Sequence, residues 1–451
     1  MKIVIVGGGS VGSAICAHLV DEGHDVTVVD TDMAALTEIS NICDVFGVVG
    51  NGAEVSVLKK AGAERADLLI AVTSGDEVNI LCCAAAKKLG TKQTVARVRN
   101  PEYTELMHLM KNEMNLSLTI NPELAAAKEI YRFLRFPYAA KIDTFCRGRV
   151  EVAEFTVSPD SILCGMTLGD LRAKLQLRLL VCSVLRESEA YIPAGNFRIE
   201  AGDTLCVTAA EDEIAAFFKT IKAYKRPVRN VLIVGGSRTT YYLETLLAKS
   251  KMASTVIEPN VTRCREFAEN FPCTVICDDG TKQDLLIQEG IENADAFLAL
   301  SDVDEENAII SMYAKTKNVH KTVTMIQSMS YVDLFKNVGL ENIVSPKFST
   351  ATYILRYVRS MANARGSEIE SLHTFMDGRV EALEFVIKDG IDGITDIPLK
   401  ELRPKSGVLI ACIVRRDRVI IPSGDDVMKK GDTVIVVTAG GQLKGMRDIV
   451  S

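Results

Sequence analysis

The sequence contains no tryptophan, only five histidines, and no run of about 20 apolar residues of the kind that spans a membrane. The histidines are scattered and the cysteines form no CxxC pair, so no metal-site pattern is present. Positive charge is not in excess: the formal net charge is −7, which argues against nucleic acid as a partner. The first residues do not resemble a signal peptide, because glycines follow the short apolar run after Lys2. These absences predict a cytoplasmic protein.

What the sequence does contain is an internal repeat, with an offset of about 228 residues near its start and about 230 near its end. The stretch KIVIVGGGSVG from Lys2 matches NVLIVGGSRTT from Asn230. Further on, TFCRGRVEVAEFTV from Thr144 matches TFMDGRVEALEFVI from Thr374. Matches that stay in register over this length indicate a duplicated pair of modules.

Each module has two parts with different patterns. The first part alternates short apolar runs with helical stretches, which predicts a parallel sheet covered on both faces. The second part contains alternating strands and a hairpin pattern, which predicts a small, mostly antiparallel α+β domain. We therefore predict an α/β protein with two tandem copies of a Rossmann-like parallel-sheet domain, each followed by a small α+β domain. The expected domain boundaries are 1–137, 138–225, 226–364 and 365–451.

The first module carries a glycine-rich turn, in which Gly7, Gly9 and Gly12 form G-x-G-x-x-G between a strand and a helix. The first glycine makes the tight turn, the second lets the backbone approach a pyrophosphate, and the third allows close helix–strand packing. Asp30 ends the second strand, where a carboxylate accepts hydrogen bonds from ribose hydroxyls. Thr31 follows, with no arginine nearby for a 2′-phosphate. The pattern predicts NAD(H) in preference to NADP(H), and a turn kept only for packing is the alternative.

Residues after the fourth and fifth strands are further candidates. Ser74 and Glu77 have the spacing of a capping box, which starts a helix with or without a ligand-facing role for Thr73 and Ser74. Arg97 and Arg99 alternate along the fifth strand. We expect one of them to reach the nucleotide and the other to be structural.

The second module departs from this pattern. Gly235, Ser237 and Thr240 occupy the three glycine positions, while Glu258 occupies the position of the acid. Ser237 places a side chain where the backbone should meet the pyrophosphate, and Arg238 offers a compensating charge. We expect either a weakened dinucleotide site or a domain that keeps the fold for a structural or altered ligand role.

Catalytic groups are not evident beside the first glycine turn. A dehydrogenase needs an acid or base next to the nicotinamide, and no histidine follows a predicted strand end there. Cysteine and serine nucleophiles also lack partners. The sequence therefore predicts a nucleotide sensor that is not an enzyme, and an NAD(P)-dependent oxidoreductase is the alternative.

These features resemble the TrkA family of Trk system potassium uptake proteins of bacteria and archaea, whose modules are called RCK domains (regulators of potassium conductance). The resemblance covers essentially the whole chain and rests on MKIVIVGGGSVGSAIC, TVVDTD, AGAERADLLIAVTSGDEVNILCCAAAKKLG, VARVRNPEY and the two GRVE…EF strands. It implies a regulatory subunit that is cytoplasmic and peripheral on the inner face of the cell membrane, where it gates an integral-membrane TrkH- or TrkG-like potassium transporter. It also implies a homotetramer or another symmetric ring. A sensor for a different cation channel or exporter is the alternative.

The resemblance further implies NAD or NADH as the ligand, with ATP or ADP bound in relatives. The residues that it assigns to the first site are Gly7, Gly8, Gly9, Ser10, Val11, Gly12, Asp30, Asn51, Thr73, Ser74 and Arg97. The corresponding residues of the second site are Gly235, Gly236, Ser237, Arg238, Thr239 and Glu258. A separate candidate is the helical segment with Tyr131, Phe133, Leu134 and Phe136, which predicts either a dimer contact or ordinary core.

Overall fold

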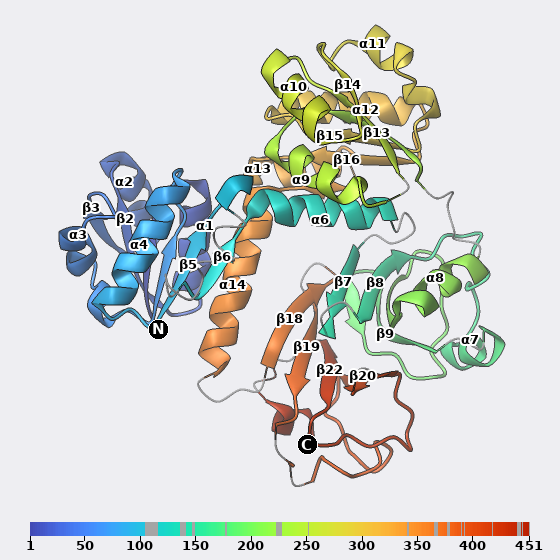
Figure 1. Cartoon of the computed structure of the whole chain (residues 1–451). Helices are drawn as coiled ribbons and strands as arrows, with labels where there is room; N and C mark the ends of the chain where they lie inside the picture. The colour runs from blue at the N-terminus through green and yellow to red at the C-terminus, as the bar shows by residue number, and fades with distance from the viewer. Residues whose placement is uncertain are drawn as a thin grey trace. The chain divides into compact units, whose positions relative to one another are not determined.

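The computed structural model describes all residues except 104–115, 136–140, 147–148, 176–177, 222–227, 251, 341, 365–368, 377–378, 389, 392, 417, 440–442, 444 and 451. The chain forms two compact units, Met1–Leu134 with Val228–Leu355 and Arg135–Pro227 with Arg356–Ser451. The first unit contains two parallel sheets, and the second contains two antiparallel sheets (Figure 1). The predicted fold class is thus confirmed.

The first parallel domain is a six-stranded sheet in the order β3-β2-β1-β4-β5-β6. Its central strands β1 and β4 are short apolar runs that are buried on both faces, as the pattern of Lys2–Val6 requires. The strand order reverses between β1 and β4, and at such a switch point open α/β sheets bind their ligands. The elements are β1 (Lys2–Val6), α1 (Ser10–Asp21), β2 (Asp25–Asp30), α2 (Met33–Ile42), β3 (Phe46–Val49), α3 (Val55–Lys60), η1 (Ala63–Arg65), β4 (Leu68–Ala71), α4 (Asp76–Leu89), β5 (Gln93–Arg97), β6 (Leu118–Ile120) and α6 (Pro122–Arg135).

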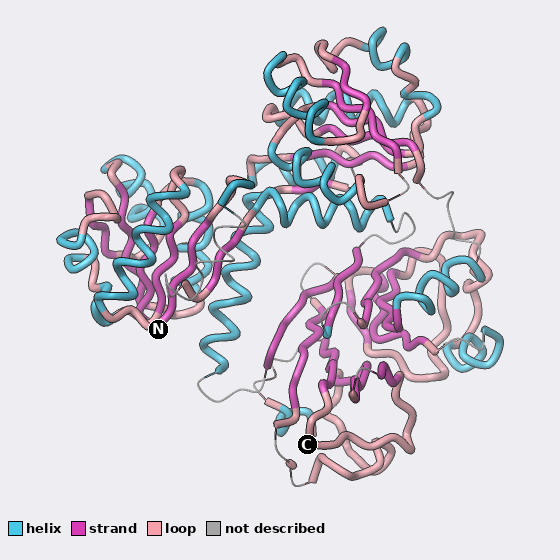
Figure 2. The backbone as a smooth tube through the Cα atoms, viewed as in Figure 1, coloured by secondary structure: helices cyan, strands magenta, loops and turns pink. Residues whose placement is uncertain are grey.

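The second parallel domain repeats this topology in the order β14-β13-β12-β15-β16-β17. Helices accompany its sheet as they do the first (Figure 2). The elements are β12 (Asn230–Val234), α9 (Arg238–Leu247), β13 (Ala253–Ile257), α10 (Val261–Asn270), β14 (Thr274–Ile276), α11 (Gln283–Gln288), η3 (Ile291–Asn293), β15 (Ala296–Ala299), α12 (Asp304–Thr316), β16 (Lys321–Met325), α13 (Met329–Asn337), β17 (Ile343–Val344) and α14 (Pro346–Ala364).

Helix α6 joins the two parallel domains within the first unit. Its apolar residues Ala126, Ala127, Ile130 and Leu134 belong to the same core as strands β12 and β16 of the second sheet. Tyr131 and Phe133 pack against that core as partly buried side chains. The segment expected to form a dimer contact or an intradomain core is therefore a contact between the two repeats of one chain; Phe136 lies outside the described residues.

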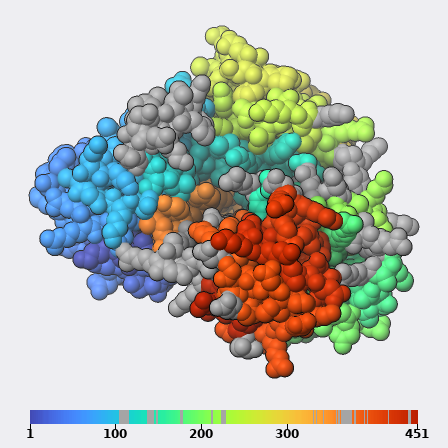
Figure 3. Space-filling model, turned by 60° about the horizontal axis from the view of Figure 1, so that its bottom comes forward, coloured from blue at the N-terminus to red at the C-terminus, as the bar shows by residue number. Residues whose placement is uncertain are grey.

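The two small domains have equivalent five-stranded antiparallel sheets, ordered β10-β9-β11-β8-β7 and β18-β19-β22-β20-β21. The predicted hairpin is confirmed, because β9 and β10 pair antiparallel across a turn at Glu187 and Ser188. In the space-filling view the second small domain is the red surface (Figure 3). The elements are β7 (Lys141–Phe145), β8 (Val150–Thr156), α7 (Leu168–Leu175), β9 (Leu179–Arg186), β10 (Glu189–Tyr191), β11 (Thr204–Ala210), α8 (Glu211–Thr220), β18 (Ile369–Phe375), β19 (Val380–Val386), β20 (Val408–Arg415), β21 (Arg418–Ile420), β22 (Thr433–Ala439) and η4 (Met446–Ile449).

Within the second unit the small domains share a core and exchange equivalent hydrogen bonds. The Cys146 N–H donates to Glu384 Oε2 over 3.2 Å, and the Met376 N–H donates to Glu154 Oε2 over 2.9 Å. Side chains of both sheets meet in one hydrophobic cluster that includes several buried thiols. The duplication thus produces a two-fold-like pair inside one chain.

Candidate nucleotide site

The candidate residues of the first module gather at one edge of the first parallel sheet. The Gly7–Gly12 loop follows β1, Asp30 is the last residue of β2, and Thr73 follows β4 closely. Arg97 is the last residue of β5. Because the strands are parallel, their carboxyl ends lie along this same edge, where the strand order also reverses.

Each glycine of the loop has a different steric environment. Gly7 has φ +109°, and a Cβ there would lie 2.9 Å from the Thr73 backbone nitrogen. A Cβ at Gly12 would lie only 1.8 Å from the Gly7 carbonyl oxygen, so close packing of α1 requires glycine. A Cβ at Gly9, in contrast, would meet nothing within 4 Å. Packing within the protein does not require glycine at position 9, and the loop leaves open space there.

Helix α1 begins immediately at this open space. Gly9 is its N-cap residue and supplies no side-chain cap, so Ser10, Val11 and Gly12 lie in an uncapped first turn. Gly9 and Ser10 are exposed. An uncapped and accessible helix N-terminus offers N–H groups and a partial positive charge to an anion.

Asp30 connects the second strand to the glycine loop. Its Oδ2 accepts a hydrogen bond from the Gly8 N–H over 2.6 Å, and its Oδ1 accepts one from the Asp32 N–H over 2.9 Å. The carboxylate is half-buried and therefore keeps access to solvent. It is held by the backbone beside the loop, as a group that binds ribose hydroxyls must be.

Asn79 fixes the loop after β4, although sequence reasoning did not select it. Its Oδ1 accepts hydrogen bonds from the Thr73 N–H and hydroxyl, and its Nδ2 donates to the carbonyl oxygens of Thr73 and Arg97. Asn307 makes the corresponding bonds to Ser301 and Met325 in the second module. Both repeats carry an asparagine at this position, and this recurrence in the sequence could have identified Asn79 as a structural residue of the loop.

The capping box expected from Ser74 and Glu77 is wrong. Helix α4 starts at Asp76 with Gly75 as its N-cap, so Ser74 lies outside the helix. The Glu77 carboxylate instead accepts a hydrogen bond from the Tyr103 hydroxyl. Helix α4 has no side-chain cap, and Asp76 in its first turn instead accepts hydrogen bonds from the N–H groups of Arg99 and Asn100 after β5.

The expected placement of both Arg97 and Arg99 on the fifth strand is also wrong, while the expectation that one of them reaches the nucleotide stays a prediction. Strand β5 ends at Arg97, so Arg99 lies beyond the strand and does not follow its alternation. Arg97 donates to the Thr73 carbonyl over 2.6 Å, and Arg99 donates to the Ser74 carbonyl. Both guanidinium groups therefore turn toward the loop after β4, at the edge that carries the candidate site.

Glu123, at the start of α6, is a second residue that sequence reasoning missed. Burial raises the pKa of its carboxyl, while a backbone hydrogen bond and the charges of Arg99, Arg97 and Arg238 act in the opposite direction. Burial lowers the pKa of Arg97, with a further lowering by the charge of Arg99. Among the described residues, Arg97 Nε and Glu123 Oε2 are buried without a hydrogen-bond partner. Arg238 belongs to the second module, so charges from both modules act on Glu123.

Asn51 lies one strand further from the glycine loop than Asp30. It follows β3, the edge strand, and its Oδ1 accepts a hydrogen bond from the Ala53 N–H over 3.0 Å. Its side chain is exposed. The structure thus places Asn51 at the same sheet edge, in a local turn.

The second module satisfies its loop with its own side chains. Gly235 keeps the left-handed conformation with φ +103°, and the Gly236 N–H donates to Glu258 Oε2 over 2.6 Å. The Thr240 hydroxyl donates to the Gly235 carbonyl over 2.6 Å, and the Ser237 hydroxyl caps α9 by accepting from the Thr240 N–H. The Gly236–Glu258 bond has a counterpart in the Gly8–Asp30 bond of the first module, whereas the cap on the Thr240 N–H has none, because Gly9 supplies no side-chain cap to α1.

The second loop is also less exposed at two equivalent positions. Ser237 is 6% exposed and Glu258 is 4% exposed, whereas their counterparts Gly9 and Asp30 are exposed and half-buried. Arg263 Nη1 lies 4.0 Å from Glu258 Oε2 and 3.6 Å from Asp302 Oδ2, so its side chain links the ends of β13 and β15. The predicted departure of the second module has a structural counterpart in this closed arrangement.

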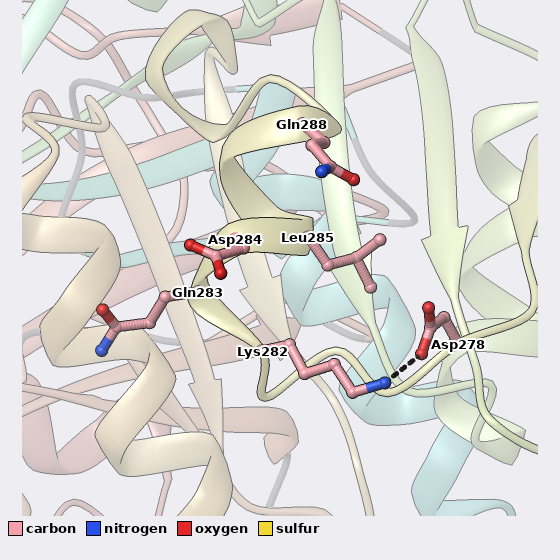
Figure 4. Close-up of a pocket in the computed structure, with 6 residues that line it drawn as sticks. All are labelled: Asp278, Lys282, Gln283, Asp284, Leu285 and Gln288. Atoms are coloured by element: carbon pink, nitrogen blue, oxygen red, sulfur yellow. Dashed lines mark hydrogen bonds and ion pairs between the residues drawn. The ribbon is translucent and has the colours of Figure 1, made fainter.

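A hollow of about 510 Å³ lies elsewhere, beside α11 of the second parallel domain (Figure 4). It is lined by Asp278, Lys282, Gln283, Asp284, Leu285 and Gln288. Lys282 Nζ lies 2.6 Å from Asp278 Oδ1, and Leu285 is the single apolar side chain of the lining. Because the hollow is polar and contains no residue of either glycine loop, we assign it no part in the nucleotide site.

The family models for two domain types match this chain twice each. The TrkA-N domain matches residues 3–117 and 231–346, and the TrkA-C domain matches residues 152–222 and 385–451. These ranges correspond to the parallel sheets and the small antiparallel domains.

Relatives with curated names match along nearly the whole chain. Trk system potassium uptake protein TrkA of Halomonas elongata is 34% identical, with 97% of this chain and 95% of that protein covered. The TrkA homolog 1 of Methanosarcina mazei is 33% identical, with 97% of each chain covered. Among solved structures, the GsuK channel bound to NAD has a TM-score of 0.64 at 17% identity, covering 97% of this chain and 77% of that one. This structural likeness supports the fold.

Proposed function

Because the chain belongs to the TrkA family of Trk system potassium uptake proteins, we propose that it is the nucleotide-binding regulatory subunit of a potassium uptake system. In this proposal the first parallel domain binds a nucleotide and thereby shifts the equilibrium between two arrangements of the assembly. The partner is an integral-membrane potassium transporter of the TrkH or TrkG type. The observation that carries the proposal is the open, uncapped Gly9–α1 turn beside the Asp30 carboxylate.

The residues of the first site fit a dinucleotide. The N-terminal turn of α1 suits the pyrophosphate, since Gly9 leaves room for close approach and the first-turn N–H groups are not capped. Asp30 suits the ribose hydroxyls. Arg97, with a buried Nε that lacks a partner among the described residues, suits a further anionic or polar group of the ligand.

NAD or NADH is the ligand that we propose, and ATP or ADP is the second candidate because all four share the adenosine and phosphate groups that this site fits. The bound molecule supplies a signal, and the protein contributes binding and orientation. None of the described histidines follows the carboxyl end of a strand in the first parallel sheet, so we propose no hydride transfer and no enzymatic activity.

We propose a different role for the second parallel domain. Its loop is closed by the hydrogen bonds of Ser237 and Thr240, and Arg263 lies within ion-pair distance of Glu258, which favours a structural or altered ligand role over ordinary dinucleotide binding. Gly235, Gly236, Arg238, Thr239 and Glu258 thus keep the architecture of the loop.

The assembly and location follow the same proposal. None of the helices in the described part of the chain has the length and apolar character that crossing a bilayer requires. We propose a homotetramer or another symmetric ring, docked on the cytoplasmic face of the membrane beneath the transporter.

The proposal is tested by potassium flux through the cognate transporter in proteoliposomes, with the intact chain and each nucleotide added in turn. We expect flux to depend on nucleotide with the native chain and to lose that dependence with Asp30→Ala. Glu258→Ala, at the equivalent position of the second module, is the matched control and should retain the dependence. Flux that ignores nucleotide, or consumption of NADH with a metabolite, would overturn the proposal in favour of a different role.

A further inference from the structure

A tyrosine of the second module contacts the backbone of the first module's candidate site. Tyr242 lies on α9 and is 5% exposed. Its hydroxyl donates to the Arg99 carbonyl oxygen over 2.9 Å and accepts from Asn121 Nδ2 over 2.8 Å. Asn121 precedes α6, which Figure 1 shows next to α9, in agreement with their shared hydrophobic core.

The segment that Tyr242 holds is part of the site. The N–H groups of Arg99 and Asn100 each donate to Asp76 Oδ2 over 2.8 Å, which ties the segment to the start of α4. The Arg99 guanidinium donates to the Ser74 carbonyl, and Arg97 donates to the Thr73 carbonyl. A displacement at Thr73, Ser74 or Arg97 would therefore reach the Arg99 carbonyl through a continuous set of hydrogen bonds.

Helix α9 is well placed to carry such a displacement onward. It starts at Arg238, directly after the glycine turn of the second module, and the charge of Arg238 acts on Glu123 together with those of Arg97 and Arg99. Tyr242 and Glu123 thus form two separate links between the same pair of regions. One link is a hydrogen bond to the backbone and the other is electrostatic.

The hydrogen bond from Tyr242 of the second module to the first has no counterpart from the first module to the second. The first module has Ala14 at the position of Tyr242, while the second has Gln327 and Ser345 at the positions of Arg99 and Asn121. The repeat therefore has not kept a reciprocal contact from the first module to the second site. An asymmetric contact of this kind distinguishes the two modules by role.

We propose that Tyr242 is a positioning residue through which the second module holds the nucleotide site of the first and receives the signal of its occupancy. This inference rests on the proposed function, because it requires a nucleotide at the first site. Binding would order the Arg97–Asn100 segment, and the Tyr242 hydrogen bond would pass that change to α9.

The absence of tryptophan makes a direct test available, because one introduced tryptophan is the only such reporter in the chain. Tyr241→Trp places it on α9 next to Phe271, whose ring centroid lies 4.9 Å from that of Tyr241. We expect ADP, added to the intact chain, to change the emission of this tryptophan. Asp30→Ala should abolish the change, which would locate its origin at the first site.

The decisive variant adds Tyr242→Phe to the reporter chain, which removes only the hydroxyl. We expect ADP affinity to fall by up to roughly tenfold, according to how much the hydrogen bond strengthens when nucleotide binds. At saturating ADP, verified by calorimetry, the emission change should also be lost, which a purely structural role of the hydroxyl would not cause. Tyr241→Phe, on the unmodified chain, is the control for affinity and should leave it unchanged.

Each other outcome is also decisive. If calorimetry detects no nucleotide binding by the native chain, the proposed function fails before this inference is reached. If binding occurs but the emission of Tyr242→Phe responds as fully as that of the parent reporter, the inference is overturned. A signal that survives Asp30→Ala would also overturn it, since the ligand would then act from another site. Should Tyr241→Trp fail to fold, Phe271→Trp provides the same reporter from the other ring of the pair.

Discussion

The buried carboxyl of Glu244 makes a sharp prediction about how stability depends on pH. Glu244 lies on α9, is 1% exposed, and accepts a hydrogen bond from the Ser254 hydroxyl over 2.9 Å. Its Oε1 has no partner among the described residues. Burial raises the pKa of Glu244 from its usual value to about 7, with the Ser254 hydrogen bond acting in the opposite direction.

The sign of the effect follows from proton binding. Between about pH 4.5 and 7 the folded chain keeps this carboxyl protonated while the unfolded chain loses the proton, so stability falls as pH rises through this window. A shift from 4.5 to about 7 corresponds to a free energy of unfolding lower by about 3 kcal/mol above the window than below it. Glu244→Gln cannot ionise and should remove this dependence.

The assay is urea unfolding at pH 5, 6, 7 and 8, followed by circular dichroism, for the native chain, Glu244→Gln and Glu269→Gln. Glu269 is exposed on α10 and serves as the matched control. We expect the free energy of unfolding of Glu244→Gln to rise relative to that of the native chain by up to about 3 kcal/mol as pH increases from 5 to 8. The free energy of unfolding of Glu269→Gln should follow that of the native chain at every pH. If the free energies of unfolding of the native chain and of Glu244→Gln change with pH in parallel, the Glu244 carboxyl does not have the raised pKa that its burial implies.

Four further substitutions separate binding from folding. Gly9→Leu should abolish nucleotide binding in calorimetry yet change the unfolding free energy by less than about 0.5 kcal/mol, because the site around Gly9 is open. Gly12→Ala should cost about 1–3 kcal/mol in urea unfolding, since its Cβ would clash with the Gly7 carbonyl, and an unchanged stability would contradict the packing. Asn79→Ala should lower the free energy of unfolding by about 3 kcal/mol and also weaken nucleotide binding, because the Thr73 N–H loses its acceptor. Nucleotide binding at native strength would show that the loop after β4 is not part of the site. Arg186→Met should lower the free energy of unfolding of the second unit by about 3 kcal/mol, because the Asp203 carboxylate (1% exposed) loses its two hydrogen bonds of 2.7 and 2.8 Å. Nucleotide binding should be unaffected by this substitution.

Regular patterns allowed most of the fold to be predicted from the sequence. Apolar runs such as Lys2–Val6 have to be buried on both faces, and the helical stretches between them leave few alternatives to a parallel sheet. The repeat then transferred each assignment to the second module. The positions of Gly7, Gly12 and Asp30 also followed from spacing alone, because a tight turn and a strand end are local features.

Contacts between distant segments were not predictable in the same way. The location of α6 against the second sheet depends on which apolar surface it covers, and its sequence shows only that it has one. Arg99 was misassigned because the end of β5 at Arg97 depends on pairing with its neighbours. Asn79 and Tyr242 act through hydrogen bonds to backbone groups far along the chain, and no local pattern marks such bonds.

A regulatory subunit differs from an enzyme in that the site of its first module would bind a nucleotide without consuming it. Isothermal titration calorimetry of the intact chain with NADH tests this most directly, together with the absorbance of the reduced nicotinamide afterwards. We expect one NADH to bind per chain and to be unchanged at the end of the titration, with binding lost in Asp30→Ala and kept in Glu258→Ala. Full binding by Asp30→Ala, or two equivalent sites that both remain in Asp30→Ala, would show that the nucleotide does not bind at the first module as proposed.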